Sequence, residues 1–341
     1  MGLLENVLSK EEYNFMKESS GQLKENICLL GLGGSHAYGT NVDGSDLDIR
    51  GVMLDSVDNI IGIKDNLEQI EDRTTDTVIY TMDKMYNLLS NCNPNVIEIL
   101  GLRKQDYLYI DDIGQMLLDN KHIFLSKQAY DKFFGYAKGQ LIRLENALVN
   151  RANNGISNVK DAERLLRFRI ESKVSEYKRK YTGFNAEVYT DNGLVEINYT
   201  FDRLTRKKIN HILNEIESIK TSLNDLGKRA GRAIKKGEDQ IGKHAMHLVR
   251  LYFMCIDILE HREIITYREK EHALLMNIRN GGMQKADGNF KQEFYTLIKE
   301  LEIMMKTSLE RSKLPDRPCI TQLGDLRKQI NLETLQRYKA I

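Results

Sequence analysis

Two aspartates one residue apart follow a glycine-rich turn in the segment "GLGGSHAYGTNVDGSDLDIRG" (residues 31–51). If this part is a strand, alternation places Asp46, Asp48 and Arg50 on one face and Leu47 and Ile49 on the other. Carboxylates ~6.5 Å apart repel each other unless a cation lies between them. Hard cations such as Mg²⁺ prefer oxygen ligands, and two such ions ~3.5–4 Å apart support in-line displacement at phosphorus.

The turn before these aspartates has the composition of a phosphate-binding segment. Gly33 and Gly34 let backbone N–H groups approach an anion closely, and Ser35 adds a hydroxyl. A short helix starting near Ser35 would add its positive end. His36 either hydrogen-bonds substrate or caps the turn. The segment therefore predicts a nucleoside triphosphate site with a metal beside it.

Three other motifs fit these residues less well. A dinucleotide fingerprint needs glycine where His36 stands, and a P-loop needs lysine where Thr40 stands. An EF-hand loop starting at Asp46 would have Arg50 and Val57 at ligand positions. A plain tight turn with solvated acids is the remaining alternative.

The surrounding pattern indicates an α/β part followed by a helical part. Amphipathic spacing predicts a helix over 10–25, and β-type runs predict three strands, at 27–34, 45–54 and 75–82. A helix from residue 82 should stop at Asn93-Pro94, with Glu98 beyond it either on a helix surface or supporting the metal site. From about residue 120 the apolar spacing is helical, except for a hairpin at 187–200 with its turn at Asp191-Asn192-Gly193.

Charge is unevenly distributed along the 341 residues, whose net charge is +1. Residues 1–120 hold 9 Lys and Arg against 21 Asp and Glu, whereas residues 121–341 hold 41 against 28. This distribution suits a metal site facing a polyanion, although two ordinarily solvated surfaces are the alternative. The four separated cysteines argue against a zinc site or a disulfide framework. No membrane span or signal peptide is indicated, so we expect a cytoplasmic protein with no membrane partner.

The segment "GGSHAYGTNVDGSDLDIRGV" resembles the nucleotidyltransferases of the DNA polymerase β superfamily, and most of all the RNA-repair-associated branch called RlaP. The stretches "DTVIY", "NPNVIEIL", "FFGYAKGQL", "KHAMHLVRL" and "ALLMNIRNGG" resemble that branch as well. The resemblance implies an α/β nucleotidyltransferase palm, a mixed sheet with flanking helices, in 1–120. A larger, mostly α-helical domain that binds substrate or nucleotide would follow in 121–341.

The resemblance also implies roles for particular residues. Asp46 and Asp48 match the metal-binding pair, and Gly34 and Ser35 match the phosphate-contacting turn. A third carboxylate should come from a neighbouring strand. Asp76 fits best, with Glu71 and Asp72 as alternatives. The third carboxylate would bind the metal and help deprotonate the attacking hydroxyl. The metal would be two Mg²⁺ ions, or Mn²⁺ in their place.

Basic residues of the helical half form weaker candidates. Lys243, His247 and Arg250 share one helix face, where they would hold a triphosphate, and a solvated polar face is the alternative. Arg279 would either join them or form a surface ion pair. The basic segments 203–208 and 228–236 would follow a phosphate backbone or lie on an ordinary solvated surface.

The expected reaction is transfer of a nucleoside monophosphate from an NTP, with ATP favoured, to a hydroxyl, with release of pyrophosphate. The expected acceptor is RNA, either a tRNA or a damaged 3′ end. A protein acceptor, as in AMPylating toxins, is one alternative, and a non-catalytic nucleotide- or RNA-binding regulator is another. The sequence does not indicate the oligomeric state.

Overall fold

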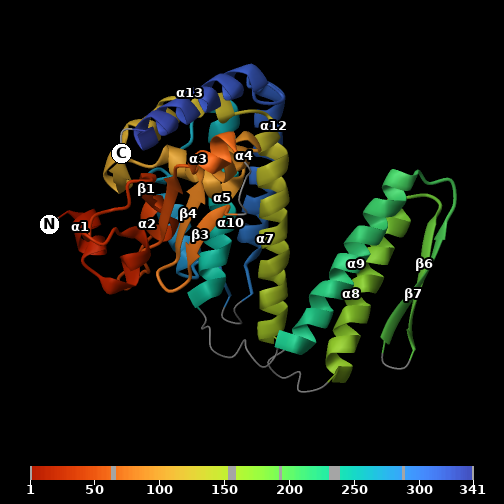
Figure 1. Cartoon of the computed structure of the whole chain (residues 1–341). Helices are drawn as coiled ribbons and strands as arrows, with labels where there is room; N and C mark the ends of the chain where they lie inside the picture. Colours follow the sequence, from red (N-terminus) through yellow and green to blue (C-terminus); the bar gives the residue numbers. More distant parts are fainter. Residues whose placement is uncertain are drawn as a thin grey trace. The chain divides into compact units, whose positions relative to one another are not determined.

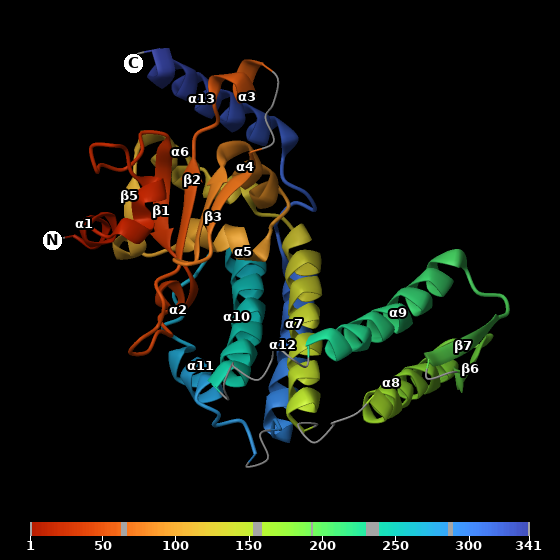
Figure 2. The same cartoon turned by 60° about the horizontal axis from the view of Figure 1, so that its bottom comes forward.

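The computed structural model describes residues 2–62, 67–152, 159–191, 194–229, 239–285 and 289–339 (Figures 1 and 2). The chain divides into two compact units. Unit 1 contains Met1–Glu145 and Ile241–Ile341, and unit 2 contains Asn146–Gln240. This division does not coincide with the predicted boundary at residue 120, because helices on both sides of unit 2 in the chain pack with the sheet-containing part.

Unit 1 contains a five-stranded mixed sheet in the order β3-β4-β2-β1-β5. Strand β1 pairs antiparallel with β2 and β5, β2 pairs parallel with β4, and β3 pairs antiparallel with β4. The strands are β1 (Ile27–Leu32), β2 (Ile49–Met53), β3 (Gln69–Asp72), β4 (Thr77–Thr81) and β5 (Tyr107–Ile110). The three predicted strands are therefore present but shorter than expected, and β3 and β5 were not predicted.

The N-terminal segment packs on the sheet through buried side chains. Val7 of α1 (Leu3–Leu8) and Tyr13 and Met16 of the 3₁₀ helix η1 (Glu11–Met16) join a core with Ile49 and Ile79 of the central strands. The helix predicted over 10–25 is wrong beyond Met16, because the chain turns back at Gly21, whose φ is +82°.

Helices cover the sheet and extend unit 1. Helices α4 (Met82–Ser90) and α6 (Asp112–Asp119) contact the central strands. Helices α7 (Gln128–Ala152, which continues into unit 2), α10 (Asp239–His261) and α12 (Gln292–Arg311) run side by side in both Figure 1 and Figure 2. The other helices of unit 1 are α2 (Gly34–Tyr38), α3 (Val57–Ile61), α5 (Pro94–Ile97), η2 (Glu98–Gly101), η3 (Lys104–Asp106), η4 (Lys121–Phe124), α11 (His272–Arg279) and α13 (Ile320–Lys339).

The C-terminal helix α13 is attached to the sheet-containing part by ion pairs. Arg327 lies 2.5 Å from Asp55, and Arg337 lies 2.5 Å from Asp111, in each case between a guanidinium nitrogen and a carboxylate oxygen. Asp55 is almost completely buried, so its charge needs this partner.

Unit 2 is a helical pair with a β-hairpin. Helices α8 (Val159–Lys180) and α9 (Arg206–Arg229) pack with β6 (Phe184–Asp191) and β7 (Leu194–Phe201) around Ile170, Val174 and Tyr177. The predicted hairpin is confirmed and is longer than expected. Of its predicted turn, Asn192 and Gly193 lie outside the described residues.

All four cysteines are free, and three of them are buried. No helix in the described part of the chain is long and apolar enough to cross a lipid bilayer.

Candidate active site

The pairing of β2 with β4 brings two aspartates together. The strands are parallel with Ile49 opposite Thr77, so the preceding residues, Asp48 and Asp76, lie next to each other at the same edge of the sheet. Burial, a hydrogen bond with Asp76 and the charge of Asp76 raise the pKa of Asp48 to about 7. The same hydrogen bond and the nearby Arg50 lower the pKa of Asp76. The two carboxyl groups therefore share a proton near neutral pH.

Arg50 holds Asp76 in place. Its Nη1 donates to the Asp76 carbonyl oxygen at 2.5 Å, and its Nη2 lies 3.3 Å from Asp76 Oδ1. Asp76 needs this support because its φ of +46° lies in the left-handed region, which is unfavourable for a residue with a side chain. The charges of Arg50 and Lys243 both favour the ionised form of Asp48 and of Asp76.

The glycine-rich turn lies directly against Asp48. Gly33 N donates to the Asp48 carbonyl oxygen at 2.8 Å, and α2 begins at Gly34, which confirms the predicted short helix. Gly34 has φ +55°, and a Cβ placed on it would lie 1.6 Å from Asp48 Oδ2. The carboxylate thus occupies the space that any other side chain at position 34 would need. Ser35, the next residue, is buried.

Asp46 does not join this pair. It is exposed in the loop before β2, which begins only at Ile49, so the predicted alternation of faces does not reach residues 46 and 48. Ser45 instead closes a turn, since its hydroxyl accepts from Val42 N at 2.9 Å. Among the described residues, no group of three His, Cys, Asp or Glu side chains is placed to hold a metal ion. His36 lies at this loop, with Nε2 3.5 Å from the Ser45 carbonyl oxygen.

The two alternatives to Asp76 have other partners. Asp72 Oδ1 accepts hydrogen bonds from Thr75 N at 2.8 Å and from Thr75 Oγ1 at 3.0 Å, and these bonds lower the pKa of Asp72. Glu71 lies 3.5 Å from Arg73 across an exposed ion pair. Of the three acids, Asp76 is the one whose carboxyl group meets that of Asp48.

The basic stripe on α10, formed by Lys243, His247 and Arg250, is not a uniformly solvated face. Lys243 is exposed and lies close enough to Asp48 and Asp76 to affect both pKa values. The His247 ring packs edge-on against Tyr38 at 5.5 Å between centroids. Burial, and after it the charges of Arg250 and Lys243, hold the pKa of His247 well below its usual value, so the imidazole is neutral.

Arg250, the third member of the stripe, is buried beneath the turn. Its guanidinium lies 3.6 Å above the Tyr38 ring, and its Nη1 lies 3.1 Å from Glu98 Oε2. The Tyr38 hydroxyl lies 2.9 Å from Glu98 Oε1. Arg279 is also buried and donates to the Thr40 carbonyl oxygen just after the turn. These two arginines therefore support the turn from its buried side.

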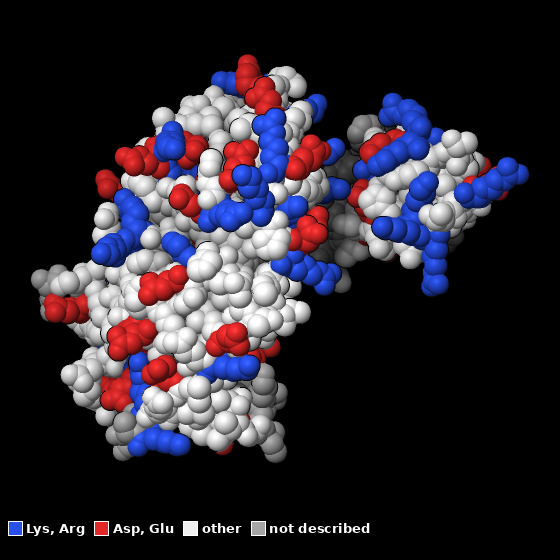
Figure 3. All heavy atoms as spheres, turned by 90° about the horizontal axis from the view of Figure 1, so that it is seen from above, with Lys and Arg blue, Asp and Glu red and all other residues white. Residues whose placement is uncertain are grey.

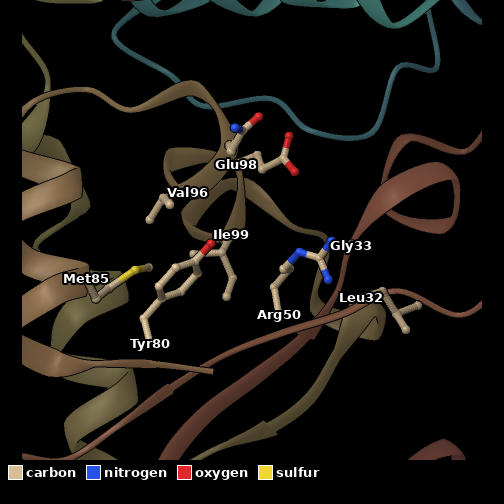
Figure 4. Close-up of a pocket in the computed structure, with 9 residues that line it drawn as sticks. Leu32, Gly33, Arg50, Tyr80, Met85, Val96, Glu98 and Ile99 are labelled. Atoms are coloured by element: carbon tan, nitrogen blue, oxygen red, sulfur yellow. The ribbon is translucent and has the colours of Figure 1, made fainter. Parts of the chain in front are cut away.

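Sequence reasoning did not identify Tyr38, and it left Glu98 between two roles. Both lie in stretches that carry the family resemblance, but no spacing rule relates residues 38, 98 and 250. Glu98 also lines a small pocket together with Arg50 and Tyr80 of the sheet, shown in Figure 4. The remaining lining residues are Leu32, Gly33, Met85, Asn95, Val96 and Ile99. The pocket thus borders the carboxylate pair through Arg50 and the turn through Gly33.

Comparison with known proteins gives one match. No curated protein and no solved structure matches the chain. The family model of the RNA repair pathway DNA polymerase beta family, RlaP, matches residues 8–180. The matched half contains the turn, all the candidate carboxylates, Tyr38 and Glu98, whereas Lys243, His247 and Arg250 lie beyond it. The chain therefore belongs to the RlaP family, a family of nucleotidyltransferases related to DNA polymerase β.

Proposed function

We propose that this protein is a Mg²⁺-dependent nucleotidyltransferase that moves a nucleoside monophosphate from an NTP, with ATP favoured, to a hydroxyl of an RNA acceptor and releases pyrophosphate. The observation that carries the proposal is the Asp48–Asp76 pair, held by Arg50 and set against Gly34 of the turn. Membership of an RNA repair family supports RNA as the acceptor.

The donor set suits a divalent cation. Asp48 and Asp76 offer oxygen ligands, which Mg²⁺ prefers. The pKa of Asp48 is raised in part by the negative charge of Asp76, and a cation bound between them would compensate this charge. Asp48 and Asp76 would hold the metal, with Asp46 contributing from the adjoining loop. The metal would be two Mg²⁺ ions, or Mn²⁺ in their place. When bound, the metal would neutralise phosphate charge and lower the pKa of the attacking hydroxyl.

The protein's own groups would position the substrates. The first N–H groups of α2, at Gly34 and Ser35, have no partners within the helix and would bind phosphate oxygens. Lys243 would offset the charge that develops on the leaving pyrophosphate. His247, being neutral, would act as a hydrogen-bonding group. Asp76 would accept the proton of the attacking hydroxyl. Arg250 would be a positioning residue for the turn rather than a phosphate ligand, because Tyr38 and Glu98 surround its guanidinium.

The test is incubation of the full chain with α-³²P-labelled NTPs, Mg²⁺ and total RNA. We expect label in RNA with the natural protein, and none with Asp48→Asn or Asp76→Asn. Asp316→Asn is the matched control, because Asp316 is exposed and its pair with Lys127 at 3.5 Å is a surface contact of little energetic value. Unchanged labelling by the two site variants would remove the carboxylate pair from the mechanism.

The same experiment tests the other acceptors. Label that appears in protein instead of RNA would identify a protein-nucleotidylating enzyme. If label appears in neither while NTP still binds, the protein is a nucleotide-binding regulator. The neighbouring carboxylates favour catalysis over regulation, since binding alone does not require two acids that repel each other.

A further inference from the structure

One end of unit 2 is strongly basic. The register of the hairpin places Phe184 opposite Phe201, and Asp202 N donates to the Gly183 carbonyl oxygen at 2.7 Å. Residues 178–184 and 201–208 therefore meet at the same end of the unit. We call these two segments the basic end. They contain seven exposed basic residues and a single acid, Asp202; the basic residues are Lys178, Arg179, Lys180, Arg203, Arg206, Lys207 and Lys208.

Folding does not account for three of these charges. Arg206, Lys207 and Lys208 form the first turn of α9, which contains no acidic residue. The N-terminal end of a helix carries partial positive charge and favours acids, so each cation there is disfavoured by about 0.3–1 kcal/mol at low salt. A positive cluster at this position therefore has a cost for the fold and requires another explanation.

Several of these cations form no ion pair with the residues that the structure describes. In the described part of the chain, neither Lys178 nor any of the three residues that open α9 takes part in an ion pair. Arg203 lies 4.0 Å from Asp202 on the open surface, and Lys180 lies over the Tyr181 ring at 5.4 Å. Figure 3 looks onto this end of unit 2 and shows Lys and Arg side chains gathered there with few acids among them.

The hairpin and helix residues beneath the basic end are well packed. Phe184 lies 5.6 Å from Phe201 and 6.2 Å from Tyr177 between ring centroids. Phe184 and Tyr177 are buried in the core of unit 2, and the partly buried Phe201 packs against it. The two segments that carry the cations are therefore fixed to a common core rather than to a loose loop. The backbone that carries these charges therefore does not need to become ordered when a polyanion binds.

We propose that the basic end of unit 2 binds the phosphate backbone of RNA. This inference rests on the proposed function, in which RNA is the acceptor, and adds the surface that holds it. A membrane surface fits less well, because surface-lying membrane segments present apolar side chains beside their basic ones. The basic end has no large exposed hydrophobic residue, and among the described residues of unit 2 such a residue occurs only at Tyr189, farther along the hairpin.

The test measures binding of a fluorescein-labelled oligouridine to the full chain by fluorescence anisotropy. The test variant replaces four cations that lack ion pairs: Lys178→Gln, Arg206→Gln, Lys207→Gln and Lys208→Gln. We expect its Kd to rise at least about tenfold. Each phosphate contact to a single strand contributes about 0.7 to the slope of log K against log salt, so the magnitude of this slope should fall by about 3.

A matched control removes the same kinds of charge from unit 1. It carries Lys270→Gln, Lys299→Gln, Lys306→Gln and Arg311→Gln, all at exposed positions. We expect it to bind RNA like the natural protein. The control variant should keep the natural melting temperature, since only exposed side chains change. The test variant should melt no lower than the natural protein, because it removes three cations that disfavour the N-terminal end of α9. Equal RNA binding by the two variants, or no RNA binding by the natural protein, would overturn the inference. So would binding to phosphatidylserine vesicles that depends on the same four residues while RNA binding does not.

The outcome is separable from the fate of the proposed function. If the natural protein transfers no label to RNA but loses RNA binding in the test variant, the proposed function fails and the basic end stands. If label is transferred and the test variant binds normally, the basic end fails and the proposed function stands.

Discussion

Replacement of Gly34 by alanine tests whether the turn and the carboxylate pair form one site. A Cβ at this position would lie 1.6 Å from Asp48 Oδ2 and 2.6 Å from Asp48 Cγ. The colliding atoms are the end of a side chain, so the protein can relieve the collision by rotating the carboxylate away. Asp48 would then leave Asp76, and the protein would lose the proposed metal-binding pair while the fold persists.

The magnitude follows from two separable effects. Alanine in the left-handed region, where Gly34 has φ +55°, costs about 1–2 kcal/mol. For a folding unit of the size of unit 1, 1 kcal/mol corresponds to about 2–4 °C in melting temperature, so Gly34→Ala should melt about 2–8 °C lower. Nucleotide transfer should fall at least about 100-fold, because a misplacement of about 1 Å in a catalytic group has effects of that order.

Gly44→Ala separates these effects. Gly44 has φ +80°, and a Cβ placed there would meet no atom within 4 Å. This variant therefore has the backbone cost without the collision, and we expect a similar fall in melting temperature with nearly natural activity. The assays are differential scanning fluorimetry and label transfer from α-³²P-ATP. Equal activities of the two alanine variants would refute the argument that position 34 must stay open for Asp48.

Three further predictions concern the surroundings of the pair. Glu98→Gln should lower the free energy of unfolding by about 3–5 kcal/mol in urea titrations, because Arg250 would keep a buried, unpaired charge. Adding Arg250→Met should recover part of this loss. If it recovers none, the ion pair between Glu98 and Arg250 is not the cause. Arg50→Lys should reduce nucleotide transfer about tenfold or more, since lysine cannot contact the carbonyl and the carboxylate of Asp76 together; natural activity would show that this contact is dispensable. The proton shared by Asp48 and Asp76, with a pKa of about 7 for Asp48, must leave before Mg²⁺ binds, so calorimetric Mg²⁺ affinity should fall about tenfold from pH 8 to pH 6; Asp48→Asn should remove this pH dependence.

Local sequence signals correctly predicted the glycine-rich turn, but they did not correctly predict the conformation of both aspartates before β2. An apolar run ending in glycines correctly located β1 and α2. The alternation argument failed at Asp46 because strand pairing stops at Ile49. There β1 ends with Leu32 opposite Ile49, and β4 begins with Thr77 opposite the same residue. Before Ile49, Asp48 keeps a backbone hydrogen bond from Gly33 N, but residues 45–47 belong to no strand. A strand's first paired residue cannot be read from its own composition.

The buried side of the site depends on contacts that no local pattern contains. Helical periodicity identified α10 and its inward residues, but the same periodicity occurs in α8 and α9, which belong to another unit. Periodicity shows that a helix buries one face and not which surface covers it. For this reason the sequence placed the domain boundary at residue 120, whereas the tertiary structure divides the chain elsewhere. The contacts of Arg250 likewise became visible only in the tertiary structure.

The candidate phosphate-binding turn is held from two sides, and this explains why distant residues should affect it. Helix α2 is one turn long and has no side-chain cap, so it is too short to be stable by itself. On one side Gly34 lies against Asp48; on the other, Tyr38 contacts Glu98 and Arg250. A change at Glu98 or Arg250 should therefore tilt the N–H groups of the turn relative to the carboxylates, although neither residue would touch the phosphates of a bound NTP. Such a change should lower kcat more than it raises the KM for ATP, because a tilted turn can still bind phosphate but no longer aligns it with the attacking hydroxyl.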